Sequence, residues 1–206
     1  GPNRDVLSML AIVRTPQSMA GFPKSLFNTA VRRTGLEDLL TRKLAQYAER
    51  LARYDEQGLS RRQLRPVKPG QTILPRTAVM VMDDYVEGRI YVDLPTPRGL
   101  IHAGAMQHIF FEDVPQVVNQ SLFYCNLDAR EVDEFVNIME DADAIRQALP
   151  TRGWVGFVAE GAHPSRQRGS DEPDYYQSMP VSMEESLRSE IQVPRAGAVK
   201  GLGVPA

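Results

Sequence analysis

The sequence predicts an α+β fold, in which a β-hairpin and further strands form a mixed sheet packed against several helices. Leucine and tyrosine recur at helical spacing between Leu36 and Tyr54, and two strand-like runs flank Asp83-Asp84. The strand-like runs follow one another as a hairpin, which differs from the strand–helix–strand alternation of a parallel α/β sheet. With 206 residues, 42% of them hydrophobic, the chain is long enough for a sizeable core.

The first long element predicted is an amphipathic helix that ends near Gly58. Its apolar residues follow at spacings of three and four, from Leu36 to Tyr54, and its polar side carries lysine, arginine and glutamate. Residues 58–75 are rich in proline, glycine and arginine and show no periodicity. We therefore expect them to form a loop.

A hairpin and a second helical segment follow. Residues 77–82 and 86–94 are rich in β-branched residues and are joined by a turn at Asp83-Asp84. Residues 104–124 have a helical pattern. Pro115 should kink that helix or start a new one, because proline donates no backbone hydrogen bond.

The last third of the sequence predicts a capped helix and two strands. Asp128 and Glu131 have the spacing of an acidic capping box, with helical patterns over residues 129–139 and 141–149. Residues 154–158 are almost all apolar, which favours a buried strand, and residues 187–193 alternate as a strand does. The remainder is Gly- and Pro-rich.

Several classes of protein are excluded by composition. The single Cys125 excludes an internal disulfide and a multi-cysteine zinc site. No apolar run approaches the roughly 20 residues of a membrane helix, so we expect no membrane partner. None of the common nucleotide, hydrolase or metalloprotease motifs is present, so no catalytic or metal-binding residue is assigned.

Charge is unevenly distributed along the chain, although the formal net charge is only −2. Residues 32–68 hold ten Lys and Arg against five Asp and Glu, and residues 112–143 hold nine Asp and Glu against one Arg. A loop at residues 159–170 adds two arginines among small residues, a composition suited to phosphate contact. Solvated helix faces and an ordinary surface loop explain the same patterns. The arginines that could contact nucleic acid are Arg32, Arg33, Arg61, Arg62, Arg65, Arg166 and Arg168.

Seven short segments follow one another along the chain: residues 20–23, 32–38, 76–79, 86–89, 140–141 with Leu149, 157–162 and 197–205. In this order they resemble the N-terminal region of predicted ABC-class ATPases. That family includes an ATPase of the kinetoplastid mitochondrial RNA-editing machinery.

The resemblance implies a domain at residues 20–206 that precedes an ABC-type ATPase domain absent from this chain. Residues 1–19 would then be a tag remnant and an N-terminal extension. In the family, the Gly-x-Gly-x-Pro ending leads into the P-loop strand and the Walker A motif. The full-length protein would use ATP and Mg²⁺, whereas this chain alone would be no enzyme. Its partners would be RNA or single-stranded nucleic acid, its own ATPase domain and a second copy. If the protein is like the kinetoplastid member of the family, its location would be the mitochondrial matrix. Otherwise its location would be the cytoplasm.

Two functional hypotheses remain open. In the first, the domain binds nucleic acid through the arginines named above, with Tyr175 and Tyr176 available for stacking on bases. In the second, it is a structural domain that completes the nucleotide-binding fold or the dimer without binding nucleic acid. The cluster Arg61, Arg62 and Arg65 favours the first. Because residues 58–75 lack apolar periodicity, we expect alanine at these three positions to weaken binding and to leave the fold intact.

Overall fold

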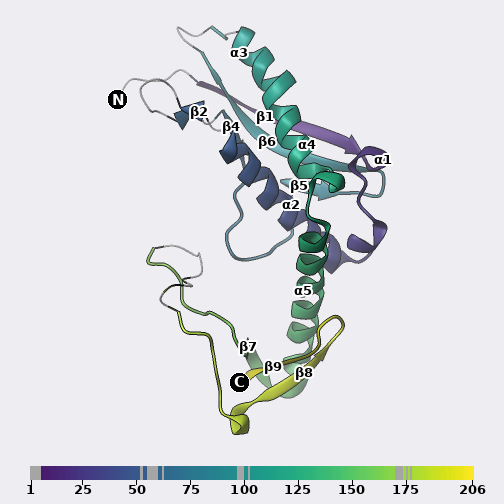
Figure 1. Cartoon of the computed structure of the whole chain (residues 1–206), viewed down its shortest axis with the longest axis vertical. Helices are drawn as coiled ribbons and strands as arrows, with labels where there is room; N and C mark the ends of the chain where they lie inside the picture. Colours follow the sequence, from purple (N-terminus) through teal and green to yellow (C-terminus); the bar gives the residue numbers. More distant parts are fainter. Residues whose placement is uncertain are drawn as a thin grey trace. The chain divides into compact units, whose positions relative to one another are not determined.

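The computed structural model describes residues 6–51, 53–54, 60–61, 63–96, 100–101, 103–169, 174, 176 and 178–206. The chain divides into two compact units (Figure 1). Unit 1 comprises Gly1–Pro69 and Ile73–Asp133, and unit 2 comprises Gly70–Thr72 and Glu134–Ala206. Each unit contains helices and an antiparallel sheet, so the predicted α+β class is confirmed.

The sheet of unit 1 is built around one long strand, β6 (Tyr85–Pro95). β5 (Val79–Val81) pairs with it antiparallel, which confirms the predicted hairpin. β4 (Leu64–Pro66) lies against the same edge of β6 as β5. β1 (Val6–Pro16) covers the other edge, from Val6 opposite Pro95 to Pro16 opposite Tyr85. A separate two-stranded ladder joins β2 (Arg53–Tyr54) and β3 (Ser60–Arg61).

Helices supply the other layer of the unit 1 core. The predicted amphipathic helix is α2 (Ala30–Arg50), and the Thr29 hydroxyl accepts from the Arg32 N–H at its N-terminus. The helix ends at Arg50 and not near Gly58 as predicted, since Arg53 and Tyr54 form the strand β2. Short turns α1 (Gln17–Ala20) and η1 (Lys24–Leu26) precede it. Apolar side chains of α2, α4 and β6 are fully buried, including Leu36, Leu40, Leu44, Ile90, Val92 and Leu122.

The second helical segment changes type along its length. It runs through α3 (Ala103–His108), a π-helix η3 (Ile109–Asp113) and α4 (Val114–Leu122), and the short turn η4 (Tyr124–Asn126) follows. Pro115 lies in the first turn of α4. The helical backbone continues from η3 into α4, so the kink or new helix predicted at Pro115 takes the form of a change from π-helix to α-helix.

Two parts of unit 1 differ from the predictions. Residues 58–75 were expected to be a loop, yet β3 and β4 form there and the Leu64 side chain is buried opposite Val92. Residues 6–16, assigned above to an N-terminal extension, form β1. β4 and β1 both pair with β6, which is distant from them in sequence, and local periodicity carries no information about such a partner.

Unit 2 contains a helix and a three-stranded sheet. α5 (Ala129–Ala148) starts in unit 1, where the Asp128 carboxylate accepts from the Arg130 and Glu131 N–H groups as the capping pattern predicts. The turn η5 (Pro150–Arg152) leads to β7 (Trp154–Ala159), and η6 (Glu185–Leu187) leads to β8 (Ser189–Val193). With β9 (Gly197–Pro205), the strand order is β7-β9-β8, all antiparallel.

Three predictions for unit 2 are corrected. The central strand is β9 (Gly197–Pro205), formed by the Gly- and Pro-rich ending for which no strand was predicted. β7 is half-buried instead of buried, since Val155 is exposed. α5 is one continuous helix, and the carboxylate of Asp141 on it accepts from the N–H groups of Arg195 and Ala196, which fixes the turn between β8 and β9.

Candidate functional site

The described members of the arginine cluster at residues 61–65 lie on two different strands. Arg61 lies in β3, and Arg62 is outside the described residues. Arg65 lies in β4, and two nitrogens of its guanidinium contact the Asp93 carboxylate of β6. Nε lies 2.5 Å from Oδ2, and Nη2 donates to Oδ1 at 2.8 Å. Ser8 of β1 donates to the same carboxylate at 2.6 Å. Arg65 therefore joins three strands of the sheet.

The pairing changes the acidity of Asp93. Burial raises the pKa of this carboxyl. The hydrogen bonds from Arg65 and Ser8, together with the Arg65 charge, lower this pKa by more than burial raises it. The pKa of Asp93 consequently lies below its ordinary value, and the ion pair is complete at neutral pH. The Arg65 fork, expected to face phosphate, is engaged by a carboxylate of the same sheet.

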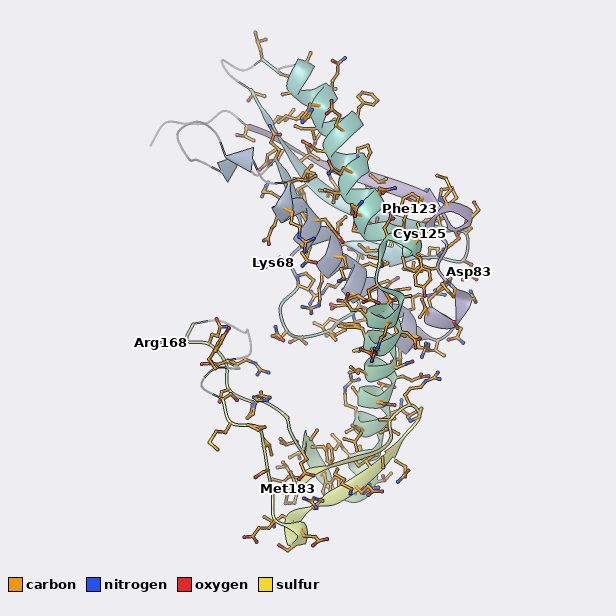
Figure 2. The ribbon with its side chains drawn as sticks, viewed as in Figure 1. Lys68, Asp83, Phe123, Cys125, Arg168 and Met183 are labelled. Carbon is orange, nitrogen blue, oxygen red and sulfur yellow. The ribbon has the colours of Figure 1, made fainter. Side chains whose placement is uncertain are left out.

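Arg32 and Arg33 are placed differently from each other. Arg32 is 4% exposed, and its Nε donates to the Ser25 carbonyl at 2.6 Å, so its predicted contact with nucleic acid is not supported. Arg33 is partly exposed and lies 3.5 Å from the Asp83 carboxylate, which also accepts from the Lys24 ammonium (Figure 2). These two cations lower the pKa of Asp83, mainly through the Lys24 hydrogen bond.

The loop between β7 and β8 carries the last two predicted arginines. The Arg166 guanidinium donates to the carbonyls of residues 163–165, at 3.0 to 3.3 Å, and so organises the loop backbone. Arg168 is exposed on the outlying part of this loop (Figure 2), and its guanidinium makes no ion pair with any described residue. Tyr176, on the same loop, is 98% exposed, while Tyr175 lies outside the described residues. Glu140 of α5 pairs with Arg195, whose Nε lies 2.6 Å from its carboxylate.

A second feature, which the sequence did not indicate as a site, is the outer edge of β1. Its 11 residues pair with β6 on one side, and among the described strands none pairs with the other side. Its apolar side chains are largely exposed, including Val6, Leu7, Met9, Leu10 and Ile12. The apolar run of residues 6–13 was the available signal, but its length alone did not distinguish a buried from an exposed strand.

A groove of about 550 Å³ runs beside this edge, between β1 and the helical segment η3–α4. Its lining is mostly apolar and includes Ala11, Val13, Met19, Val114, Val118 and Phe123. We call it the β1–α4 groove. Together with the unpaired strand edge, it offers both main-chain hydrogen bonds and an apolar surface to an added strand.

Glu87 fixes the end of β1 next to this groove. The carboxylate is buried in the sheet, at 2.6 Å from the Arg14 Nε of β1 and 2.8 Å from the Arg89 Nε of β6. The Arg14 hydrogen bond is the main cause that lowers the pKa of Glu87, and Arg89 adds to it against the opposing effect of burial. The ion pair holds β1 and β6 in register beside the groove, which Arg14 also lines.

Comparison with known proteins agrees with this division of the chain. No curated protein matches it. The family model for the N-terminal region of ATPases of the ABC class matches residues 8–125. The family model for the ABC ATPase P-loop domain matches residues 128–206, so this domain begins within the chain and not beyond residue 206 as the resemblance implied. Since the N-terminal model alone covers more than half of the sequence, the chain belongs to the ATPases of the ABC class, of which it contains the N-terminal region.

Proposed function

We propose that unit 1 is an assembly module of this ABC-class ATPase, which holds two copies of the protein together. The observation that carries the proposal is the unpaired apolar edge of β1 beside the β1–α4 groove. A long exposed apolar edge favours association, because it presents unsatisfied backbone groups and uncovered hydrocarbon at the same place. This function corresponds to the structural hypothesis set out from the sequence.

The ion pairs of unit 1 support an assembly role over phosphate binding by the same unit. A phosphate would have to displace a carboxylate that is already in contact with the arginine, and little counterion release would accompany the exchange. The Lys and Arg side chains of unit 1 that lie within 4 Å of a carboxylate include Arg14, Lys24, Arg33, Arg42, Lys43, Arg65, Lys68, Arg76 and Arg89.

Binding of RNA or single-stranded nucleic acid is the second candidate function, and it is favoured by the loop of unit 2. Arg168 offers a guanidinium without a carboxylate partner among the described residues, and Tyr176 offers an almost fully exposed ring. Phosphate contact by arginine and base stacking on tyrosine are the usual combination for single strands. A role in RNA editing in the mitochondrial matrix, as the family resemblance implies, depends on this second candidate.

The family implies ATP and Mg²⁺, which would need residues in this chain that hold phosphates and a metal ion. The sequence contains no Gly-x-x-x-x-Gly-Lys-Ser/Thr motif to hold the phosphates. In the described ranges, no group of three His, Cys, Asp or Glu side chains converges on a metal position. These residues do not fit a Mg²⁺–ATP site, and we assign no step of hydrolysis to them.

None of the described helices is long and apolar enough to cross a membrane.

Sedimentation velocity across a concentration series tests the assembly role. We expect a reversible dimer whose population rises with protein concentration. A chain that stays monomeric at every concentration would contradict the proposal.

Titration of a labelled oligouridine tests the second candidate independently. Arg168→Ala should weaken binding and reduce the salt dependence by about one phosphate contact. Arg50→Ala is the matched control, because it removes an exposed arginine of the same charge from unit 1. Equal effects of the two variants would exclude a specific role of the loop.

A further inference from the structure

Within the described part of the chain, the outer edge of β1 lacks the features that usually protect an edge strand. Natural edges are short, bulged, or interrupted by lysine and proline, which prevents pairing with another chain. β1 is 11 residues long and keeps a continuous register with β6. Its only charged residue is Arg14, and its only proline is the last residue, Pro16. Its backbone can accept another strand along its whole length.

We propose that β1 of one copy pairs antiparallel with β1 of a second copy, about a two-fold axis at Ala11, so that two unit 1 sheets become one. This inference rests on the assembly role proposed above and names its surface and register. An axis at Ala11 is the one that engages all 11 residues, since Val6 then faces the partner's Pro16. In antiparallel pairs, directly opposed residues point to the same face of the sheet.

The side chains of β1 are self-complementary in this register. Leu10 faces the partner's Ile12, and both are about half exposed in the single copy. Met9 faces the partner's Val13, and Arg14 faces the partner's Ser8, so that no like charges are opposed. The residue on the axis is alanine, whose methyl group meets its own copy without crowding.

The β1–α4 groove explains the exposed residues at the other end of the strand. The groove lies beside residues 11–16 of β1, whereas Leu7 and Met9, 41% and 37% exposed, lie at the start of the strand on the same face as Ala11 and Val13. Antiparallel pairing brings the partner's Leu7 and the partner's Met9 opposite Thr15 and Val13, beside the groove. Each copy therefore supplies the apolar side chains that cover the groove of the other.

The available surface is large enough for a stable dimer. A strand of 11 residues is about 37 Å long, and a sheet with its helix layer is about 20 Å high, so the contact strip measures about 700 Å² per copy. Standard protein interfaces bury about 800 Å² per partner. The strip is close to this size and mostly apolar at its centre.

Cysteine cross-linking tests the register directly. In a Cys125→Ser background, which removes the exposed native thiol, Ala11→Cys places identical residues about 5 Å apart across the axis, within disulfide reach. Ile12→Cys is the matched control. Its two copies would be about 8 Å apart, beyond disulfide reach. We expect a covalent dimer with Ala11→Cys and none with Ile12→Cys. Equal cross-linking of both, or of neither while the dimer persists, would overturn the register.

Charge exchange tests the surface without a covalent bond. Two double variants are needed, one with Leu10→Lys and Ile12→Lys and one with Leu10→Glu and Ile12→Glu. Each opposes like charges in its own homodimer, so each dimer should be weakened at least about tenfold. An equimolar mixture opposes lysine to glutamate and should restore the dimer. Ile138→Lys with Val155→Lys, at exposed sites of unit 2, controls for lost hydrophobicity and should dimerise as the parent does.

The outcomes separate this inference from the proposed function. If the parent dimerises and the charge variants dimerise equally well, the β1 surface is refuted and an assembly role remains. The same holds if the parent dimerises and mixing the two charge variants does not restore the dimer. A parent that is monomeric refutes both. Melting temperatures of all variants, measured in parallel, show that any loss of dimer occurs in folded protein.

Discussion

Gly201 in β9 provides the most direct test of the unit 2 packing. A Cβ atom at this position would lie well under 3.0 Å from the Val158 carbonyl oxygen and the Phe157 ring, with Phe157 Cε1 at 2.7 Å. The carbonyl belongs to β7, which pairs with β9, so relief requires one strand of the ladder to move. Overpacking costs about 1–3 kcal/mol, and alanine regains about 0.5–1 kcal/mol of the flexibility cost of glycine. We expect Gly201→Ala to destabilise unit 2 by about 1–2 kcal/mol, which corresponds to a melting temperature about 5–15 °C lower.

Urea unfolding followed by tryptophan fluorescence measures this effect in the correct unit, because Trp154 in β7 is the single tryptophan of the chain. Gly156→Ala is the control within the same sheet. Its Cβ would meet only Val204, at 3.9 Å, so we expect a neutral or slightly stabilising change. A Gly201→Ala midpoint equal to that of the parent, or equal losses for both variants, would refute the close approach of β7 and β9.

Three further predictions concern the unit 1 sheet and the nucleotide. The folded pKa of Glu87 lies below the usual value near 4.5, so the stability that Glu87 contributes is complete above that value and is lost as pH falls through the folded pKa. The difference in stability between the parent and Glu87→Gln should therefore shrink in acid. A difference in urea midpoints that stays constant from neutral to acidic pH would contradict the ion-pair geometry. Leu64→Ala should destabilise unit 1 by about 2–3 kcal/mol, since this side chain of β4 is buried, and a change near zero in chemical denaturation would restore the loop interpretation of residues 58–75. The purified 206-residue chain should not hydrolyse ATP, because its sequence lacks the Walker A lysine and hydroxyl residue, and turnover in a phosphate-release assay that survives further purification would show otherwise.

Elements specified by nearby residues could be predicted from the sequence. α2 follows from leucines at spacings of three and four, the β5–β6 hairpin from two runs flanking Asp83-Asp84, and the start of α5 from Asp128 three residues before Glu131. In each case the signal lies within a few residues of the structure that it specifies. The α+β class followed from these elements together.

Strands specified by distant residues could not be predicted. β9 has glycine at positions 201 and 203, which normally weakens a strand. Here the missing side chains leave room for Phe157 and Trp154 of β7, and that requirement appears only when the two strands are paired. β1 has an ordinary apolar sequence, and its edge position depends on β6, whose other side is taken by β4 and β5.

The candidate arginines show the same limit for charge. Arg32 and Arg33 are neighbours of the same residue type, yet one is buried against the Ser25 carbonyl and the other lies near Asp83 at the surface. The excess of positive charge in residues 32–68 and of negative charge in residues 112–143 is in part mutual, since Lys43 contacts Glu131. Counts along the sequence cannot show which charges neutralise one another in the fold.

Salt dependence distinguishes the two functions that remain. Strand pairing through β1 depends on backbone hydrogen bonds and apolar contact, and Arg14, its one charged residue, is paired with Glu87 in the same copy. Dimer dissociation should therefore change little between low and physiological salt. RNA binding through Arg168 should instead weaken with salt, because each phosphate contacted on a single strand contributes a slope of about −0.7 in a log–log plot. Sedimentation and RNA titration in the same buffers give both slopes. A dimer that dissociates steeply with salt would mean that ion pairs, and not the β1 edge, hold the copies together.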